Sequence, residues 1–186
     1  MQGGERSWTG SSVPGMAPTI TDRPDMAGYG VEDDLDGVLP WTWAVERLVG
    51  SRSYWVVTVS GDGRPHAMPV WGVWRADEDD YWFSCAPTAR KVRNLAENDR
   101  ITVATEDPTR FVSVEGRAEK VEPGPALEPA IDGYGAKYAE FADGTPEEFA
   151  EFMAQTAFYR VTPERAFGII ETPEDFARRA TRWRWT

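Results

Sequence analysis

A short basic segment, residues 88–96, holds the side chains whose types and spacing are best suited to chemistry. Its sequence, Thr-Ala-Arg-Lys-Val-Arg-Asn-Leu-Ala, predicts a helix with Thr88 as N-cap and with Arg90 and Lys91 in the first turn. Positive charge is unfavourable there, because the helix dipole is already positive at that end. A bound phosphate would reverse the penalty, since free backbone N–H groups, the Thr88 hydroxyl and two cations would converge on it, with Asn94 one turn away.

The same basic segment also has a purely structural explanation. The chain carries 31 acidic and 20 basic residues, so a solvated basic helix would find carboxylates of its own protein to pair with. The residues favour the two interpretations about equally, and both stay open at this point.

A second candidate is the apolar stretch of residues 66–74, which Pro69 interrupts. Proline cannot donate to a β-ladder, so one side of this strand is expected to lack a paired neighbour. Free backbone groups beside Val70 and Trp71 would then bind the polar edge of a heterocycle. Taken alone, an ordinary edge strand or bulge is the favoured explanation.

The remaining reactive residue types are scarce. His66 and Cys85 are the only histidine and the only cysteine, which excludes an intrachain disulfide and a cysteine-based zinc site. We expect His66 to be a surface or partly buried polar group and Cys85 to be a small buried hydrophobe rather than a nucleophile. Most of the nine tryptophans are expected in the core, with Trp71, Trp183 and Trp185 as candidates to line a ring pocket. The carboxylates show no spacing that selects a catalytic pair.

The elements that must position these residues are mostly strands. The pattern predicts a helix at 40–49, which Gly50 ends, and strands at 54–60, 64–75, 81–85, 101–105 and 110–121, then strands at 158–162, 166–170 and 181–185. The first strand is expected to be buried on both faces, and the strand at 110–121 alternates with period two. A capping box at Thr145 and Glu148 begins a helix whose buried face would be Phe149, Phe152 and Met153, and a short helix is expected from Thr172. Antiparallel strands with inserted helices indicate a small β-barrel with peripheral helices, in the α+β to mainly-β range.

The domain organisation follows from composition. Residues 1–38, rich in Gly, Pro and Ser, are expected to be a flexible N-terminal arm, and residues 39–186 one barrel domain with a helical insertion near 123–157. A solvated tail is the favoured explanation of the arm. The alternative is an arm that folds over a partner subunit, with Trp8 or Tyr29 as its anchor.

Charge and hydropathy exclude several classes of function. A net charge of −11 argues against a general nucleic-acid binder and against docking on an anionic membrane. Residues 1–30 lack the apolar core of a signal peptide, and no run approaches transmembrane length. We therefore expect a cytoplasmic protein.

Four segments, in this order and spacing, resemble a known family. Residues 63–71, 81–84, 90–95 and 112–118 are similar to the pyridoxamine 5'-phosphate oxidase-like split β-barrel proteins, closest to their flavin- and deazaflavin-dependent oxidoreductase branch. Residues 180–185 are similar to the ending of that branch. The resemblance covers roughly residues 40–186 and implies a split antiparallel β-barrel of the FMN-binding type.

The resemblance also implies a homodimer with two cofactor sites at the subunit interface. The cofactor would be FMN or the deazaflavin coenzyme F-420. By position, Arg90 and Lys91 would hold its phosphate, and Trp183 would come from the partner chain. The other cofactor-binding residues implied are Ser84, Cys85, Thr88 and Asn94 near the phosphate, and the backbone of Met68, Pro69, Val70 and Trp71 facing the ring.

The family implies an oxidoreductase that passes hydride between this cofactor and a small organic substrate, such as an enone or a quinone. No catalytic residue is assigned, because the cofactor carries the hydride chemistry. One alternative is a carrier that binds flavin, deazaflavin or haem without turnover, although His66 alone makes a poor basis for haem. Another is a purely structural dimer.

Overall fold

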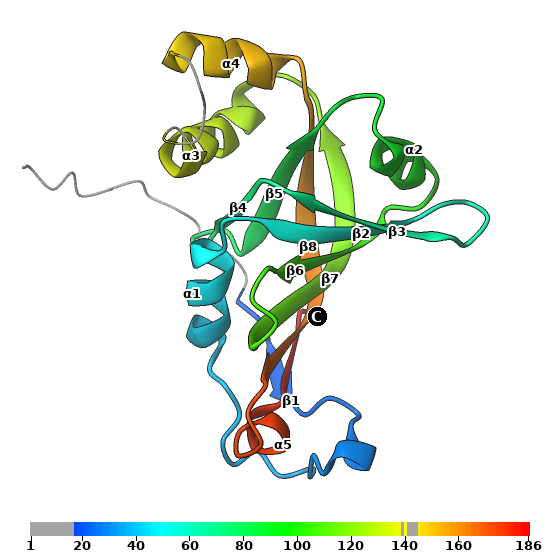
Figure 1. Cartoon of the computed structure of the whole chain (residues 1–186), viewed down its shortest axis with the longest axis vertical. Helices are drawn as coiled ribbons and strands as arrows, with labels where there is room; N and C mark the ends of the chain where they lie inside the picture. The colour runs from blue at the N-terminus through cyan, green and yellow to red at the C-terminus, as the bar shows by residue number, and fades with distance from the viewer. Residues whose placement is uncertain (1–16, 139, 141–144) are drawn as a thin grey trace, which may run out of the picture.

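The computed structural model of the chain describes residues 17–138, 140 and 145–186. Figure 1 shows strands crossing the centre of the molecule, with α1 on one side, α2 on the other, and α3 and α4 together at one end. The helices are α1 (Trp41–Gly50), α2 (Arg90–Glu97), α3 (Glu128–Tyr138), α4 (Pro146–Ala154) and α5 (Phe176–Arg179). The strands are β1 (Ile20–Asp22), β2 (Tyr54–Val59), β3 (Pro65–Val70), β4 (Gly72–Arg75), β5 (Asp80–Cys85), β6 (Arg100–Thr105), β7 (Arg110–Val121), β8 (Ala157–Ile170) and β9 (Thr181–Arg184).

The strands of the described residues form one sheet in which every pair is antiparallel. Its order is β1-β9-β8-β7-β6-β2-β3, and β5 joins β8 to β4. The first part of β8 pairs with β5 and its last part with β9, both on the side opposite β7. No ladder closes β3 onto β4, so the sheet stays open. The predicted mainly-β split barrel with peripheral helices is confirmed.

β8 corrects the prediction of two separate strands at 158–162 and 166–170. Pro163, which lies between the two predicted segments and lacks a ladder donor, does not interrupt the strand. Instead the register shifts there: Glu115 pairs with Arg165 and Gly116 with Pro163, so Glu164 is left over as a bulge. Gly116 makes this possible, because a Cβ at that position would overlap the Thr162 carbonyl.

The strand predicted at 64–75 is two strands, β3 and β4, which meet at Trp71. The first includes Pro69, which pairs in register with Trp55, and β3 has no second partner strand among the described residues. Gly72 begins the second, and its missing side chain lets the chain pass directly over the Tyr81 hydroxyl, which a Cβ would overlap. The chain therefore turns at Trp71, inside a segment expected to bind a ligand.

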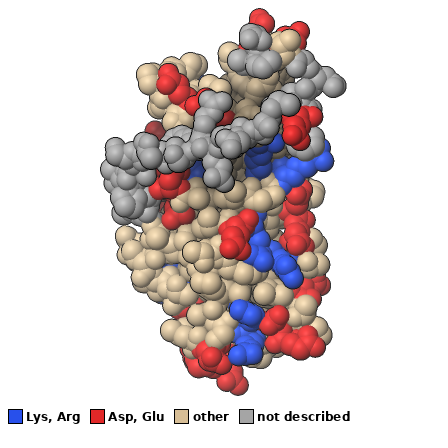
Figure 2. All heavy atoms as spheres, turned by 90° about the vertical axis from the view of Figure 1, so that its left-hand side faces the viewer, with Lys and Arg blue, Asp and Glu red and all other residues tan. Residues whose placement is uncertain are grey.

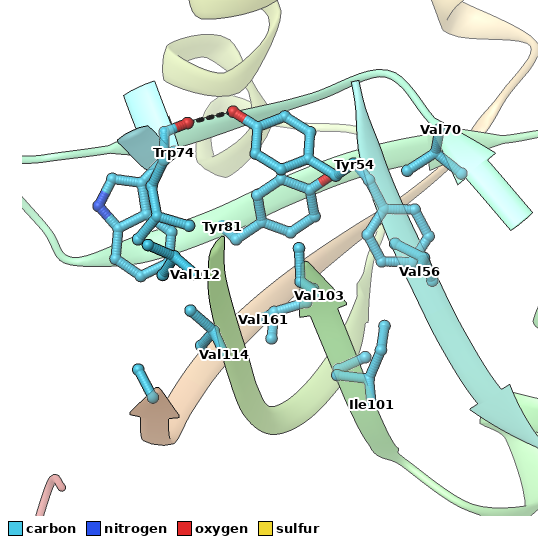
Figure 3. Packing of buried hydrophobic residues seen from close by; sticks show 14 of the residues in the cluster. Tyr54, Val56, Val70, Trp74, Tyr81, Ile101, Val103, Val112, Val114 and Val161 are labelled. Atoms are coloured by element: carbon cyan, nitrogen blue, oxygen red, sulfur yellow. Dashed lines mark hydrogen bonds between the residues drawn. The ribbon is translucent and has the colours of Figure 1, made fainter. Parts of the chain in front are cut away.

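The core lies inside the barrel, where Figure 3 shows valines of β6, β7 and β8 facing Tyr54 and Tyr81. The predicted alternation of 110–121 is confirmed, because Val112 and Val114 are buried and Arg117 is exposed. β2 is not buried on both faces as predicted: Trp55 is 46% exposed on its outer face. The hydrophobic run was misleading because only one face of this strand meets the core within the chain.

Two helices were predicted close to their observed bounds. The apolar stripe of α1 places Ala44 and Leu48 in the core, and the Leu48 carbonyl accepts a hydrogen bond from the Tyr54 hydroxyl. The capping box of α4 is present, with Thr145 Oγ1 accepting from the Glu148 N–H. Phe152, predicted on the buried face of α4, is 62% exposed and corrects that prediction.

Part of the stretch expected as a flexible arm is held on the barrel. β1 pairs with β9, and the Asp22 carboxylate accepts hydrogen bonds from Arg182 Nε at 2.8 Å and Arg184 Nη2 at 2.5 Å. The buried Arg23 donates to four backbone carbonyls, those of Asp34, Asp36, Arg178 and Ala180. Trp8, one of the two predicted anchors, lies outside the described residues, and Tyr29 contacts Phe176 of the same chain edge-on.

Candidate functional site

The start of α2 is the centre of the candidate site. The helix begins at Arg90, and its N-cap is Ala89, which makes no side-chain capping bond. The prediction of Thr88 as N-cap is wrong, because the helix starts one residue later than expected. Thr88 is exposed, and its carbonyl accepts a hydrogen bond from Arg93 Nη1 at 3.0 Å. Within the described chain, no side chain caps the first turn of α2.

Lys91 is the most unusual residue of this turn, because it is a cation that is only 7% exposed. Within the part of the chain that the structure describes, it makes no hydrogen bond and no ion pair. Arg90, half-buried beside it, also makes none there. Burying an ammonium group costs free energy unless an opposite charge compensates it. A buried lysine of this kind, next to an arginine at a helix N-terminus, is suited to hold an anion.

The hairpin of β2 and β3 lies against this turn. His66 pairs in register with Thr58, and Thr58 Oγ1 accepts a hydrogen bond from Asn94 Nδ2 at 2.9 Å. Asn94 is thus buried and fastens α2 to the barrel, a role that sequence analysis did not assign to it. Burial, and then the positive charges of Arg90 and Lys91, lower the pKa of His66 below its ordinary value. A neutral His66 therefore faces the two cations at neutral pH.

Cys85 lies at the other side of the turn, at the end of β5. It is half-buried and packs against the core, as predicted for a small hydrophobe. Burial raises the pKa of its thiol, and the nearby Lys91 opposes that shift. Lys91 therefore lies close enough to His66 on β3 and Cys85 on β5 to affect both groups.

The segment predicted to face a ring has mixed exposure. Met68 is 45% exposed and Pro69 is also exposed, whereas the side chain of Val70 enters the core. The carbonyl of Trp71 is not free, because the Tyr134 hydroxyl donates to it at 2.7 Å. The side chain of Trp71 is 36% exposed.

Tyr134 joins the two predicted binding segments through one hydroxyl group. It accepts a hydrogen bond from the Ser84 N–H at 2.8 Å and donates to the Trp71 carbonyl. Tyr138, four residues further along α3, accepts from the Gly72 N–H at 2.9 Å and stacks on Trp71. Sequence analysis missed both tyrosines. Their four-residue spacing places both hydroxyls on one helix face, which was the available signal.

Trp183 corrects the sequence-based assignment. It is fully buried in its own chain, with its ring 5.3 Å from that of Trp41 in an edge-on arrangement. Gly168 leaves the space for it, because a Cβ there would come within 2.6 Å of the indole. Trp185 also packs on Trp41. A side chain buried in this way cannot reach across an interface to a cofactor, so Trp183 is a core residue.

Other classes of site receive no support from the described residues. They contain no cluster of three or more His, Cys, Asp or Glu side chains that could hold a metal ion. None of their helices is both long and apolar enough to cross a membrane.

Comparison with known proteins identifies the family. The family profile described as pyridoxamine 5'-phosphate oxidase matches residues 44–169, which include β2 to β8 and the start of α2. The chain belongs to this family. The resemblance inferred from the sequence is thereby confirmed. No curated protein matches the chain significantly.

Solved structures show how widely this family's fold is used. The conserved hypothetical protein Rv2991 from Mycobacterium tuberculosis is 23% identical, with a TM-score of 0.62 over 73% of this chain and 88% of that one. An F-420 reductase is 21% identical, with a TM-score of 0.52 over 65% and 93%. HutZ, the heme storage protein from Vibrio cholerae, is 20% identical, with a TM-score of 0.54 over 65% and 87%. At these identities the likeness shows the fold alone, and the neighbours differ in what they are named for.

Proposed function

We propose that this family member is an oxidoreductase that binds FMN or coenzyme F-420 and passes hydride between the cofactor ring and a small organic substrate. The observation that carries the proposal is the buried Lys91 beside Arg90 at the uncapped start of α2. Both cofactors contain a phosphate group, which would supply the missing negative charge. The competing structural explanation, that the basic helix pairs with carboxylates of its own chain, is disfavoured since neither cation has such a partner among the described residues.

The residues present fit such a cofactor. Arg90, Lys91 and the first N–H groups of α2 would bind the phosphate. Met68 and Trp71 would offer apolar surface to a flat ring. The cofactor, once bound, supplies the hydride chemistry, while the protein positions it and excludes water.

The proposal includes a homodimer with the cofactor at its interface. Trp55, on the outer face of β2, is a large apolar side chain that this chain leaves 46% exposed. Exposed apolar surface of this kind is typical of a protein–protein contact. A Trp55→Lys substitution is expected to turn the dimer into a monomer in light scattering. A wild-type protein that is monomeric at micromolar concentration would contradict this part of the proposal.

The phosphate site is tested by titrating the protein with FMN and, separately, with F-420, following absorbance and tryptophan fluorescence. Lys91→Ala is expected to weaken binding at least about 30-fold, because it removes a charged contact worth roughly 2 kcal/mol or more. Arg93→Ala is the matched control from the same helix, and its exposed guanidinium predicts a change below about threefold. Equal binding by Lys91→Ala and wild type, with both folded, would sink the phosphate assignment.

Turnover separates an enzyme from a carrier. Reduced cofactor bound to the protein is mixed with a panel of enones and quinones, and its reoxidation is compared with that of free cofactor. Acceleration for at least one acceptor supports the oxidoreductase. Tight binding with no acceleration for any of them would favour a protein that carries the cofactor without reaction.

A further inference from the structure

A hollow of about 450 Å³ opens at the end of the barrel where α1, α5, the start of β7 and the end of β8 meet. None of its residues belongs to the candidate cofactor site. The hollow is lined by Trp43, Arg47, Thr109, Arg110, Ile170, Thr172, Asp175 and Arg179. Three of these eight side chains are arginines, contributed by three different elements of the fold.

Arg47 is held in place by α1 itself. Its guanidinium lies over the Trp43 ring, 3.8 Å from the centroid, and its Nη1 donates to the Trp43 carbonyl at 2.7 Å. Its Nε is buried and has no hydrogen-bond partner. The nearest carboxylate, that of Glu46, lies 3.6 Å away and is largely exposed, so it neutralises Arg47 only weakly. Burial, and then the nearby Arg110, lower the pKa of Arg47, although Glu46 and Asp107 act in the opposite direction.

Arg110 and Arg179 are compensated even less. Within the described residues neither guanidinium makes an ion pair, and the buried Nε of Arg179 has no hydrogen-bond partner. Asp107 attracts Arg110, but its carboxylate is already engaged by the N–H and hydroxyl of Thr109. Asp175 also lines the hollow and forms no ion pair with any of the three arginines among the interactions of the described chain.

The acidic overall charge of the chain makes arginines with few carboxylate partners unexpected. With 31 acidic residues against 20 basic ones, carboxylates are abundant, and on the face seen in Figure 2 acidic and basic groups are interspersed. The described arginines elsewhere show how such pairing is achieved: Arg117 contacts both Asp99 and Glu164. In the hollow, by contrast, Arg110 and Arg179 have no such partner among the described residues and Arg47 has only the exposed Glu46, which indicates a place for a negative charge from outside the chain.

We propose that Arg47, Arg110 and Arg179 bind a small organic anion that carries two or more negative charges. Guanidinium groups bind carboxylates and phosphate esters alike, through paired N–H donors. The volume lies in the range typical of small-molecule pockets and exceeds what an inorganic ion requires. Trp43 and Ile170 supply an apolar wall for the carbon body of the ligand. This site goes beyond the proposed oxidoreductase function and does not depend on it.

The test is calorimetric titration of the full chain with citrate, fructose 1,6-bisphosphate and inorganic phosphate at matched ionic strength. We expect one saturable site for at least one of the two organic anions. The anion that binds more tightly shows whether the site prefers carboxylates or phosphate esters. The double variant Arg110→Gln/Arg179→Gln should weaken binding of that anion at least about tenfold. The control Arg100→Gln/Arg165→Gln removes the same charge from exposed positions and should change it less than about threefold. The proposal would be overturned if neither organic anion showed saturable binding up to about 10 mM, or if both double variants lost affinity equally. It would also be overturned if inorganic phosphate bound as tightly as both organic anions.

Two further measurements keep the result decisive. Without ligand, the Arg110→Gln/Arg179→Gln variant should melt no lower than wild type, because it relieves repulsion. The organic anion that binds more tightly should raise the melting temperature of wild type only. A variant that is unfolded is replaced by the single Arg179→Gln, with the same tenfold criterion. Lys91→Ala should keep the wild-type affinity for that same anion. If it loses this affinity instead, the anion binds at the start of α2 and the arginine site is wrong.

Discussion

Trp71 and Tyr138 lie face to face, with ring centroids 4.6 Å apart and planes inclined by only 2°. Trp71 is the residue at which the chain turns from β3 into β4, and Tyr138 is the last residue of α3. Since Tyr134 of the same helix also holds the Trp71 carbonyl, α3 fixes both the side chain and the backbone of this residue. α3 is therefore structurally part of the candidate site.

Tyr134→Phe is expected to weaken cofactor binding about fivefold. It removes the hydroxyl that joins Ser84 to Trp71, and a hydrogen bond of this kind contributes about 1 kcal/mol. The measurement is the same titration with FMN and F-420. Tyr29→Phe serves as the control, because that tyrosine is 70% exposed and far from α3 in the sequence. Unchanged affinity in folded Tyr134→Phe would show that the bridge does not position the site.

Asp80→Asn is expected to lower the free energy of unfolding by about 3–5 kcal/mol. The Asp80 carboxylate is almost fully buried and accepts hydrogen bonds from Arg75, Trp82 and Arg160. Neutralising it leaves two arginines without their shared counter-ion. Urea unfolding followed by tryptophan fluorescence measures the change. Asp77→Asn, at an exposed turn position, should cost less than about 0.5 kcal/mol.

The lowered pKa of Lys137 predicts that the free energy of unfolding increases as the solution becomes mildly alkaline. Burial lowers its pKa from 10.5 to about 8, although its Nζ donates to the Tyr54 hydroxyl and the Gly72 carbonyl. Between these two values the unfolded chain binds the proton and the folded chain does not, so stability increases with pH in that window. Lys137→Met should lack this increase when unfolding free energies are compared from pH 7.5 to 10. Identical profiles for the two proteins would show that Lys137 titrates normally.

Asp22→Asn should release β1 from the barrel edge. Hydrogen bonds from Arg182, and then from Arg184, lower the pKa of Asp22 below 3.8, so the carboxylate stabilises the fold at neutral pH and loses this effect as pH falls below that value. Amide hydrogen exchange of residues 20–22 is expected to become faster in the variant. Glu119→Gln, an exposed acidic position on β7, is the control. Unchanged protection of β1 would show that the backbone ladder with β9 is sufficient.

Features that depend on neighbours in the sequence were predictable. The alternation around Val112, the capping box at Thr145 and the two cations that begin α2 each follow from residues within one or two turns of chain. The fold class followed from the same local patterns taken together.

Features that depend on distant neighbours were not predictable. Tyr134 joins Ser84 and Trp71, which lie 50 and 63 positions away in the sequence. Trp183 is buried because Gly168 leaves room for its ring, although alternation alone would also suit a surface strand. Burial of Lys91 likewise depends on how α2 packs on the barrel, which the basic sequence of that helix does not reveal.

β8 runs along most of the molecule in Figure 1, from α4 to the end near α5. Its first residue, Ala157, pairs with Cys85 at the candidate cofactor site, and its last residue, Ile170, lines the arginine hollow. A strand of this length spans on the order of 40 Å, and β7 stiffens it along most of its course. Two ligands bound at its opposite ends would not touch. Their contributions to stability should therefore simply add, and a departure from additivity would reveal that the two sites are coupled through the strand and its bulge at Glu164.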